Sequence, residues 1–292
     1  MNHKKMKTRA KINLTLDVLG KRKDNYHEVE MIMQSIDLFD EMEFISKKKG
    51  ITIYCQHCEV PIDESNIVYR AAKLLKDEYK IDKGIDIFIH KNIPVAAGLA
   101  GGSSNGAGTL QALNELWQLD LPLTKLMELG KRVGADIPFC LLGGTALAQG
   151  IGEKLQSLPP LPSNWLVLVK PPISISTAWV YKNLKINRHT QHPDTARAIQ
   201  GIKEQNIDKA IPYFYNILED VTIPAYPEIK AIKKRLEELG AKGVLMSGSG
   251  PTVFGFCRDE KEAQSICRTL KKEYNEVFIA KTYDEEVEAE DE

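Results

Sequence analysis

Residues 94–109 read PVAAGLAGGSSNGAGT and decide how the chain is interpreted. The alternating run 85–89 in front of them predicts a strand, and Leu110, Leu113 and Leu116 behind them predict the buried face of a helix. A glycine-rich turn from a strand into a helix leaves free backbone N–H groups at the positive end of the helix dipole. The stretch therefore predicts a phosphate-binding loop, with a tight turn that binds nothing as the alternative.

The sequence of this loop excludes two common phosphate motifs. No GxxxxGK[ST] pattern occurs anywhere in the chain, and no G-x-G-x-x-G pattern stands in a parallel βαβ unit with an acidic residue about 20 positions later. A second small loop, SGSGP at 247–251, lies between two predicted strands and offers further N–H groups to anionic oxygens. Read by itself, this second loop is equally well a plain β-turn.

The patterns around the glycine-rich loop predict a mixed α+β protein, because strands and helices follow one another without regular alternation. Period-two patterns predict strands at 9–19, 28–36, 41–46, 51–54, 144–149, 165–169, 243–246 and 252–257. Helical spacing predicts helices at 66–79, 123–133, 177–184, 194–204, 207–218 and 228–239.

Three prolines between 158 and 163 predict a domain boundary. We expect an N-terminal domain over 1–158, a C-terminal domain over 159–283 and a solvated acidic tail over 284–292.

Composition excludes several classes of protein. The 292 residues include 39 Lys and Arg against 40 Asp and Glu, a net charge of −1, which argues against a strongly basic nucleic-acid binder. No apolar run approaches the length of a membrane helix, and the basic N-terminus lacks the apolar stretch of a secretory signal. Five cysteines are too few for a disulfide framework in a chain of this length. We expect a cytoplasmic monomer or homodimer with neither a nucleic-acid nor a membrane partner.

Cys55 and Cys58 form a CxxC pair, which is typical of a redox site or half of a zinc site. A structural zinc site needs four ligands, and the chain has no second CxxC. The pair follows a strand-like run and does not begin a helix, where a thiolate would be stabilised. The sequence therefore favours two incidental thiols over a redox or zinc protein.

Two charged residues are candidates for chemistry beside the loop. Lys11 starts a strand and shares a face with Asn13, although a solvated strand end is its ordinary role. Asp136 lies among Ala, Ile, Pro and Phe, where the alternative is a helix cap or a turn residue. A phosphate loop, a cation and a carboxylate are the minimum set for moving a phosphoryl group to a hydroxyl.

Three blocks of sequence resemble the superfamily of galactokinase, homoserine kinase, mevalonate kinase and phosphomevalonate kinase. They are residues 10–14, AKINL, residues 94–108, and residues 248–252, GSGPT. Two further blocks, DNYHE at 24–28 and GADIPF at 134–139, resemble the branch that phosphorylates 4-diphosphocytidyl-2-C-methyl-D-erythritol at its 2-hydroxyl for non-mevalonate isoprenoid biosynthesis. The resemblance covers about residues 10–280.

This resemblance implies a ribosomal-protein-S5-like N-terminal domain, a ferredoxin-like C-terminal domain, and ATP with Mg²⁺. It implies Asp136 as the base and Lys11 as the group that orients the hydroxyl and stabilises charge. Ser104 matches a magnesium ligand. The nucleotide would contact Asn66 and Lys91 at the adenosine, and Pro94, Gly98, Leu99, Ala100, Gly101, Gly102, Ser103, Ser104, Gly248 and Ser249 at the phosphates. The acceptor, a small molecule carrying a cytidine diphosphate group, would contact Asn13, Tyr26, His27, Thr177 and Tyr181, with the two tyrosines sandwiching the base.

The chain departs from the pattern of these kinases at two places. Asn25 replaces a glycine in the turn, which Asn tolerates in a left-handed conformation. Residues 105–108, NGAG, replace an alanine-rich helix start and predict a looser helix. The alternatives are another kinase of the superfamily, such as homoserine kinase, and a non-catalytic ligand sensor. The pair Tyr26 and His27 argues against the first, and Lys11 with Asp136 argues against the second.

Overall fold

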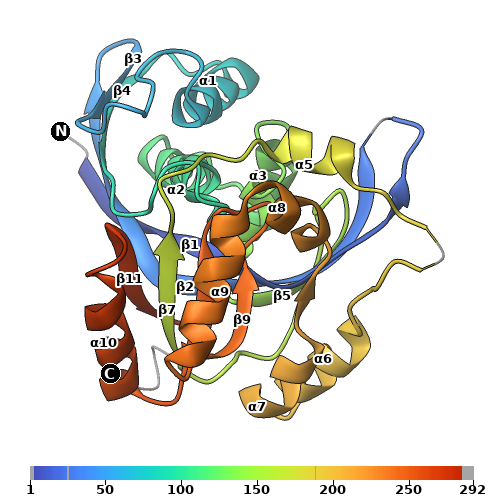
Figure 1. The fold of residues 1–292 in the computed structure, drawn as a ribbon. Helices are drawn as coiled ribbons and strands as arrows, with labels where there is room; N and C mark the ends of the chain where they lie inside the picture. The colour runs from blue at the N-terminus through green and yellow to red at the C-terminus, as the bar shows by residue number, and fades with distance from the viewer. Residues whose placement is uncertain (1–2, 25, 188, 285–292) are drawn as a thin grey trace. The chain divides into compact units, whose positions relative to one another are not determined.

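The computed structural model describes residues 3–24, 26–187 and 189–284 (Figure 1). Packing divides the chain into two compact units that are interleaved along the sequence. Unit 1 comprises Met1–Ala10, Leu38–Val95 and Ala100–Leu142, and unit 2 comprises Lys11–Asp37, Ala96–Leu99 and Gly143–Glu292. The domain boundary near residue 158 stays a prediction, and nearly all of the predicted tail lies outside the described residues.

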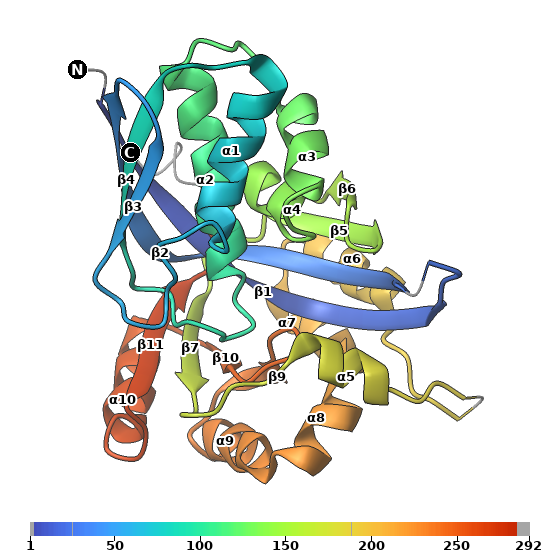
Figure 2. The same ribbon diagram turned by 90° about the horizontal axis from the view of Figure 1, so that it is seen from above.

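Two long strands, β1 (His3–Lys21) and β2 (His27–Lys47), contribute to both units (Figure 2). Two separate strands were expected where β2 is continuous, because Asp37 and Asp40 interrupt the apolar alternation. Both carboxylates accept backbone N–H groups from other segments: Asp37 from Lys281 at 2.6 Å, and Asp40 from Asn92 and Ile93 at 2.8 Å. The strand therefore continues through two acidic residues, because the carboxylate of each accepts hydrogen bonds from backbone N–H groups.

Unit 1 contains one edge of the larger sheet and the helices that pack against it. The strand order is β3-β4-β2-β1, with β4 antiparallel to β2 and β3 parallel to β4. Figure 2 shows α1 and α2 side by side, and apolar residues of both helices join the unit's core. The further elements of unit 1 are β3 (Ile51–Cys55), α1 (Ile67–Tyr79), β4 (Gly84–His90), α2 (Gly101–Leu116), α3 (Leu123–Lys131) and α4 (Ile137–Leu142).

Unit 2 contains a four-stranded antiparallel sheet in the order β11-β7-β10-β9, against which α9 and α10 pack. This order, with helices before β9 and after β10, is the ferredoxin-like arrangement that was expected. The remaining strands extend the sheet of β1 and β2: β5 pairs with β2 and β6, and β8 pairs with β1.

The elements of unit 2, beyond its parts of β1 and β2, are β5 (Thr145–Gly150), β6 (Lys154–Ser157), β7 (Trp165–Lys170), α5 (Thr177–Asn183), α6 (Thr195–Lys203), α7 (Ile207–Ala210), η1 (Ile211–Tyr213), β8 (Tyr215–Asn216), α8 (Glu219–Ala225), α9 (Pro227–Glu238), β9 (Lys242–Met246), β10 (Val253–Cys257), α10 (Glu260–Leu270) and β11 (Glu276–Lys281).

The predicted α+β class is confirmed, but the helix expected over 207–218 is wrong. That stretch forms α7, the 3₁₀ turn η1 and the short strand β8. Pro212 lacks the N–H that a continuing helix needs, and Tyr215 and Asn216 pair with Thr15 and Leu16 of β1. The patterns also gave no sign of α4, α8, α10, β6 or β11.

The glycines at the start of α2 predicted a loose helix, but in the structure they allow close packing. A Cβ on Gly108 would lie 2.4 Å from Cγ2 of Thr8, and one on Gly106 would lie 3.1 Å from Cδ1 of Ile137. These glycines let neighbouring segments pack closely against α2, which is a regular helix from its first residue. Asn25, the other departure, lies outside the described residues.

Candidate active site

Residues 96–99 of the first glycine loop lie against the second glycine loop in unit 2. Gly98 has φ +76°, and a Cβ there would lie 2.4 Å from the carbonyl oxygen of Ser247. The Ser247 hydroxyl donates to the carbonyl of Gly98 at 3.0 Å, and the N–H of Thr252 donates to the carbonyl of Ala97 at 3.3 Å. These hydrogen bonds hold the two loops in contact, which the sequence did not predict.

Lys11 and Asn13 lie on one face of β1, as their spacing predicted. The Lys11 ammonium donates to Oδ1 of Asn13 at 2.7 Å, and both residues are buried. The Lys11 backbone N–H donates to the carbonyl of Leu99 at 3.1 Å, which ties β1 to the first loop. A Cβ on Gly248, at φ +57°, would lie 3.7 Å from the Lys11 ammonium and 3.5 Å from Oδ1 of Asn13. The second loop therefore lies directly beside the Lys11 ammonium.

Thr177 joins the same cluster from the first residue of α5. Its hydroxyl lies 2.8 Å from the hydroxyl of Ser249. Unit 2 thus brings together Lys11, Asn13, Thr177, Gly248 and Ser249, which the resemblance assigned to two different ligands.

His27 and Tyr181 form a second group in unit 2, with ring centroids 5.1 Å apart and planes tilted by 35°. Burial, with a smaller contribution from the Lys21 charge, lowers the pKa of His27 and favours its neutral form. Tyr26 is 60% exposed, and its backbone N–H donates to Asp24 in the turn. The structure therefore pairs Tyr181 with the histidine, and the tyrosine sandwich stays a prediction.

The N-terminus of α2 belongs to unit 1 and has the properties of an anion site. Its N-cap, Ala100, has φ +56° and no side chain that caps the helix. The first N–H groups, those of Gly101, Gly102 and Ser103, therefore have no side-chain acceptor from the cap residue. The Ser104 hydroxyl donates its proton to the carbonyl of Arg9 at 2.6 Å. The lone pairs of its oxygen stay available to coordinate a metal.

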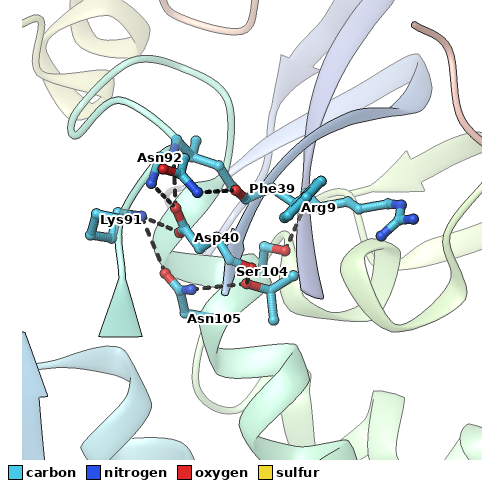
Figure 3. A network of polar contacts seen from close by, with 9 residues as sticks. Arg9, Phe39, Asp40, Lys91, Asn92, Ser104 and Asn105 are labelled. Carbon is cyan, nitrogen blue, oxygen red and sulfur yellow. Dashed lines mark hydrogen bonds and ion pairs between the residues drawn. The ribbon is translucent and has the colours of Figure 1, made fainter. Parts of the chain in front are cut away.

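The other predicted residues of unit 1 have structural partners. Asn66 is the N-cap of α1 and accepts the N–H of Val68 at 2.8 Å. The Lys91 ammonium forms an ion pair with buried Asp40, drawn in Figure 3. Pro94 is buried ahead of the loop. Contacts of Asn66 and Lys91 with adenosine stay predictions.

Asp136 precedes α4 and is half-buried. Its carbonyl accepts the N–H of Cys140 at 3.0 Å, so part of its role is to start this helix. The adjacent Ile137 fixes the position, because a Cβ on Gly130 would lie 2.5 Å from Cγ2 of Ile137. The carboxylate is therefore attached to a closely packed segment.

Sequence reasoning missed the residues that hold the second loop. Asn216 is fully buried, and its amide donates to the carbonyls of Met246 at 2.8 Å and Gly248 at 2.7 Å. Glu219 accepts the N–H of Met246 at 2.7 Å, and burial raises its pKa. No pattern in the sequence marked either residue: Asn216 lay in the helix predicted over 207–218, and Glu219 follows directly after it.

Cys55 ends β3 and Cys58 is exposed after it. Within the described ranges, no group of three or more His, Cys, Asp and Glu is arranged to hold a metal ion. None of the helices formed by those residues is both long and apolar enough to cross a membrane.

Comparison with known proteins decides the family. The model of the GHMP kinases N terminal domain matches residues 66–144, and that of the GHMP kinases C terminal domain matches 198–276. A 4-diphosphocytidyl-2-C-methyl-D-erythritol kinase of Acetivibrio thermocellus is 50% identical over 277 residues, which cover 95% of this chain and 98% of the relative. The chain belongs to the GHMP kinases, in the family of 4-diphosphocytidyl-2-C-methyl-D-erythritol kinases.

Further relatives agree with this assignment. The kinase of the same name from Clostridium novyi is 48% identical, covering 94% of this chain and 98% of the relative. The crystal structure of a 4-(cytidine 5'-diphospho)-2C-methyl-D-erythritol kinase superposes with a TM-score of 0.83 at 30% identity, covering 96% of this chain and all of the other. Mevalonate kinase of L. major, at 18% identity and a TM-score of 0.74, shares the fold. The chain is therefore a small-molecule kinase with the two-domain α+β fold of the GHMP kinases, and this family uses ATP as phosphoryl donor.

Proposed function

We propose that this kinase transfers the γ-phosphoryl group of ATP to the 2-hydroxyl of 4-diphosphocytidyl-2-C-methyl-D-erythritol, in non-mevalonate isoprenoid precursor biosynthesis. The observation that carries the proposal is 50% identity over 95% of the chain with a kinase named for this acceptor. Homoserine kinase, the alternative, is supported by structures at 20% and 15% identity, which reflect the shared fold.

In this proposal the backbone binds the phosphates. The helix start at Gly101, Gly102 and Ser103 supplies N–H groups without a capping side chain. Gly98 and Gly248 have positive φ angles, which glycine adopts without strain. Asn66 and Lys91 of unit 1 are assigned to the same nucleotide. Backbone donors suit this task because they are already oriented before the ligand binds.

The proposed chemistry uses Asp136 as the base that accepts the proton of the 2-hydroxyl. Lys11 carries a positive charge that orients the hydroxyl and stabilises negative charge in the transition state. Asn13 contributes by holding the ammonium at 2.7 Å, so that the charge stays in one position on β1. Phosphoryl transfer depends mainly on positioning and charge, and a buried lysine held by Asn13 meets both needs.

Acceptor recognition is assigned to the other cluster of unit 2. His27 and Tyr181 offer a polar edge and an aromatic face within 5.1 Å, which suits a cytosine that is stacked and hydrogen-bonded. Tyr26, exposed in the turn before His27, is assigned to the second face of the base. Thr177, with Asn13, is assigned to the erythritol and diphosphate part.

Magnesium is assigned to the nucleotide more than to the protein. The described residues provide no cluster of acidic or histidine ligands, and Ser104 already donates its proton to Arg9. Mg²⁺ in kinases is held largely by phosphate oxygens and water, and a single serine oxygen fits that pattern. When bound, it would neutralise charge on the phosphates.

An assay of ADP release with three acceptors tests the proposal. We expect turnover with 4-diphosphocytidyl-2-C-methyl-D-erythritol and none above the acceptor-free rate with homoserine or mevalonate. The uridine analogue of the first acceptor serves as the matched control for base recognition. Turnover with homoserine alone, or equal turnover with the cytidine and uridine compounds, would refute the assignment.

A further inference from the structure

Asp40 is a fully buried carboxylate that the kinase chemistry does not use. Figure 3 shows it at the centre of a network in unit 1. It accepts the backbone N–H groups of Asn92 and Ile93, both at 2.8 Å, and pairs with the ammonium of Lys91. The Lys91 ammonium in turn donates to Oδ1 of Asn105 on α2 at 3.3 Å. Asp40 therefore fixes both the chain leaving β4 and the direction of the lysine side chain.

The Lys91 ammonium lies beside the first residue of α2. A Cβ on Gly101 would be 3.2 Å from this nitrogen, and the lysine side chain is only 6% exposed. A cation at a helix N-terminus is unfavourable, because the helix dipole is positive at that end. Asp40 offsets this repulsion, since its carboxylate forms an ion pair with the same ammonium.

From this geometry we infer that Asp40 is a positioning residue for nucleotide binding: it holds the Lys91 charge behind the start of α2, where that charge attracts the phosphates of ATP. The inference rests on the proposed function and goes beyond it, because it assigns the lysine to the phosphate end and gives it a dedicated counterion. The lysine side chain is buried, so it acts through its field, and it is the ammonium of the pair that lies beside the first residue of α2.

A mutant cycle with calorimetric titration of ADP tests this inference. Asp40→Asn removes the counterion and sets an amide N–H against the ammonium, so the buried charge moves away or is lost. Lys91→Met removes the charge directly. We expect each variant to raise the Kd for ADP about 10-fold, which corresponds to about 1.4 kcal/mol. In the Lys91→Met background, Asp40→Asn should change Kd by less than about 2-fold, because both changes act through one charge.

Kinetics separate positioning from a general loss of structure. KM for ATP should rise in Asp40→Asn more than kcat falls, whereas a loss of folded protein would lower apparent kcat and leave KM unchanged. The matched control is another Lys–Asp pair of unit 1, Lys47 and Asp86, whose ammonium and carboxylate lie 2.6 Å apart. Lys47→Met and Asp86→Asn should leave the Kd for ADP unchanged.

Two results would overturn the inference. An equal rise in Kd when Asp40→Asn is made in the wild-type and Lys91→Met backgrounds would overturn the inference, because Asp40 would then act through the backbone alone. An unchanged Kd in both single variants would also overturn it. If Asp40→Asn fails to fold, Lys91→Met and the double variant, which buries no unpaired charge, still test the role of the lysine. A wild-type protein that binds no ADP would refute the proposed function instead.

Discussion

Gly98→Ala should distort the first glycine loop through two separate effects. Gly98 has φ +76°, and a side chain in this left-handed region costs about 1–2 kcal/mol. An added Cβ would also lie 2.4 Å from the carbonyl oxygen of Ser247 and 2.9 Å from that of Gly250. Both contacts are with backbone, so the second loop has to move, and overpacking of this kind costs about 1–3 kcal/mol.

The structure offers a control that isolates the second effect. Gly143 has φ +71°, and a Cβ there would meet nothing within 4 Å. Gly143→Ala should therefore lose only the left-handed penalty, about 1–2 kcal/mol, and Gly98→Ala about 2–5 kcal/mol. Urea unfolding of both variants, analysed by linear extrapolation, gives the two losses directly.

Activity provides an independent readout of the same displacement. The second loop lies beside Lys11, since a Cβ on Gly248 would be 3.7 Å from the ammonium. Gly98→Ala should therefore raise KM for ATP and lower kcat, whereas Gly143→Ala should leave both near the wild-type values. Equal losses of stability in the two variants, together with an unchanged KM in Gly98→Ala, would refute the argument that the loops are in contact.

Three further predictions concern chemistry, pH and loop support. Asp136→Asn should lower kcat about 10²–10⁴-fold, while calorimetry still detects binding of both ligands. Near-normal turnover in this variant would remove Asp136 from the mechanism. The pKa of His27 is lowered from its ordinary value of about 6.5, so the neutral form prevails above that pH and persists below it. The stability that depends on the neutral form should fall as pH drops below about 6.5, and acceptor affinity should fall at a lower pH, where His27 in the folded protein takes up its proton; the inflection in acceptor Kd should vanish in His27→Asn. Asn216→Asp places an oxygen against two carbonyls and should destabilise the protein by about 1–3 kcal/mol in urea unfolding, while Asn216→Asp with wild-type stability would show that the loop is held by other groups.

Sequence patterns predicted those parts of the molecule that depend on neighbouring residues. The face shared by Lys11 and Asn13 follows from the period of a strand, and the helix start after Ala100 follows from glycines placed ahead of an apolar face. β8 was misread because two residues paired with a distant strand outweigh any local preference. The contact between the loops at 96–99 and 247–252 was not predicted, because no local pattern specifies a partner about 150 residues away.

The residues that sequence reasoning missed share one property, and it follows from the use of glycine. A glycine loop has no side chains with which to fix itself, and glycine loses more conformational freedom on ordering than other residues do. The loops must therefore be ordered by groups from elsewhere. Asp40 accepts two N–H groups of the segment that leads into the first loop, and Asn216 donates to two carbonyls around the second. Because these side chains bind backbone atoms, they belong to no sequence motif, and no local pattern marks them as supports of the glycine loops.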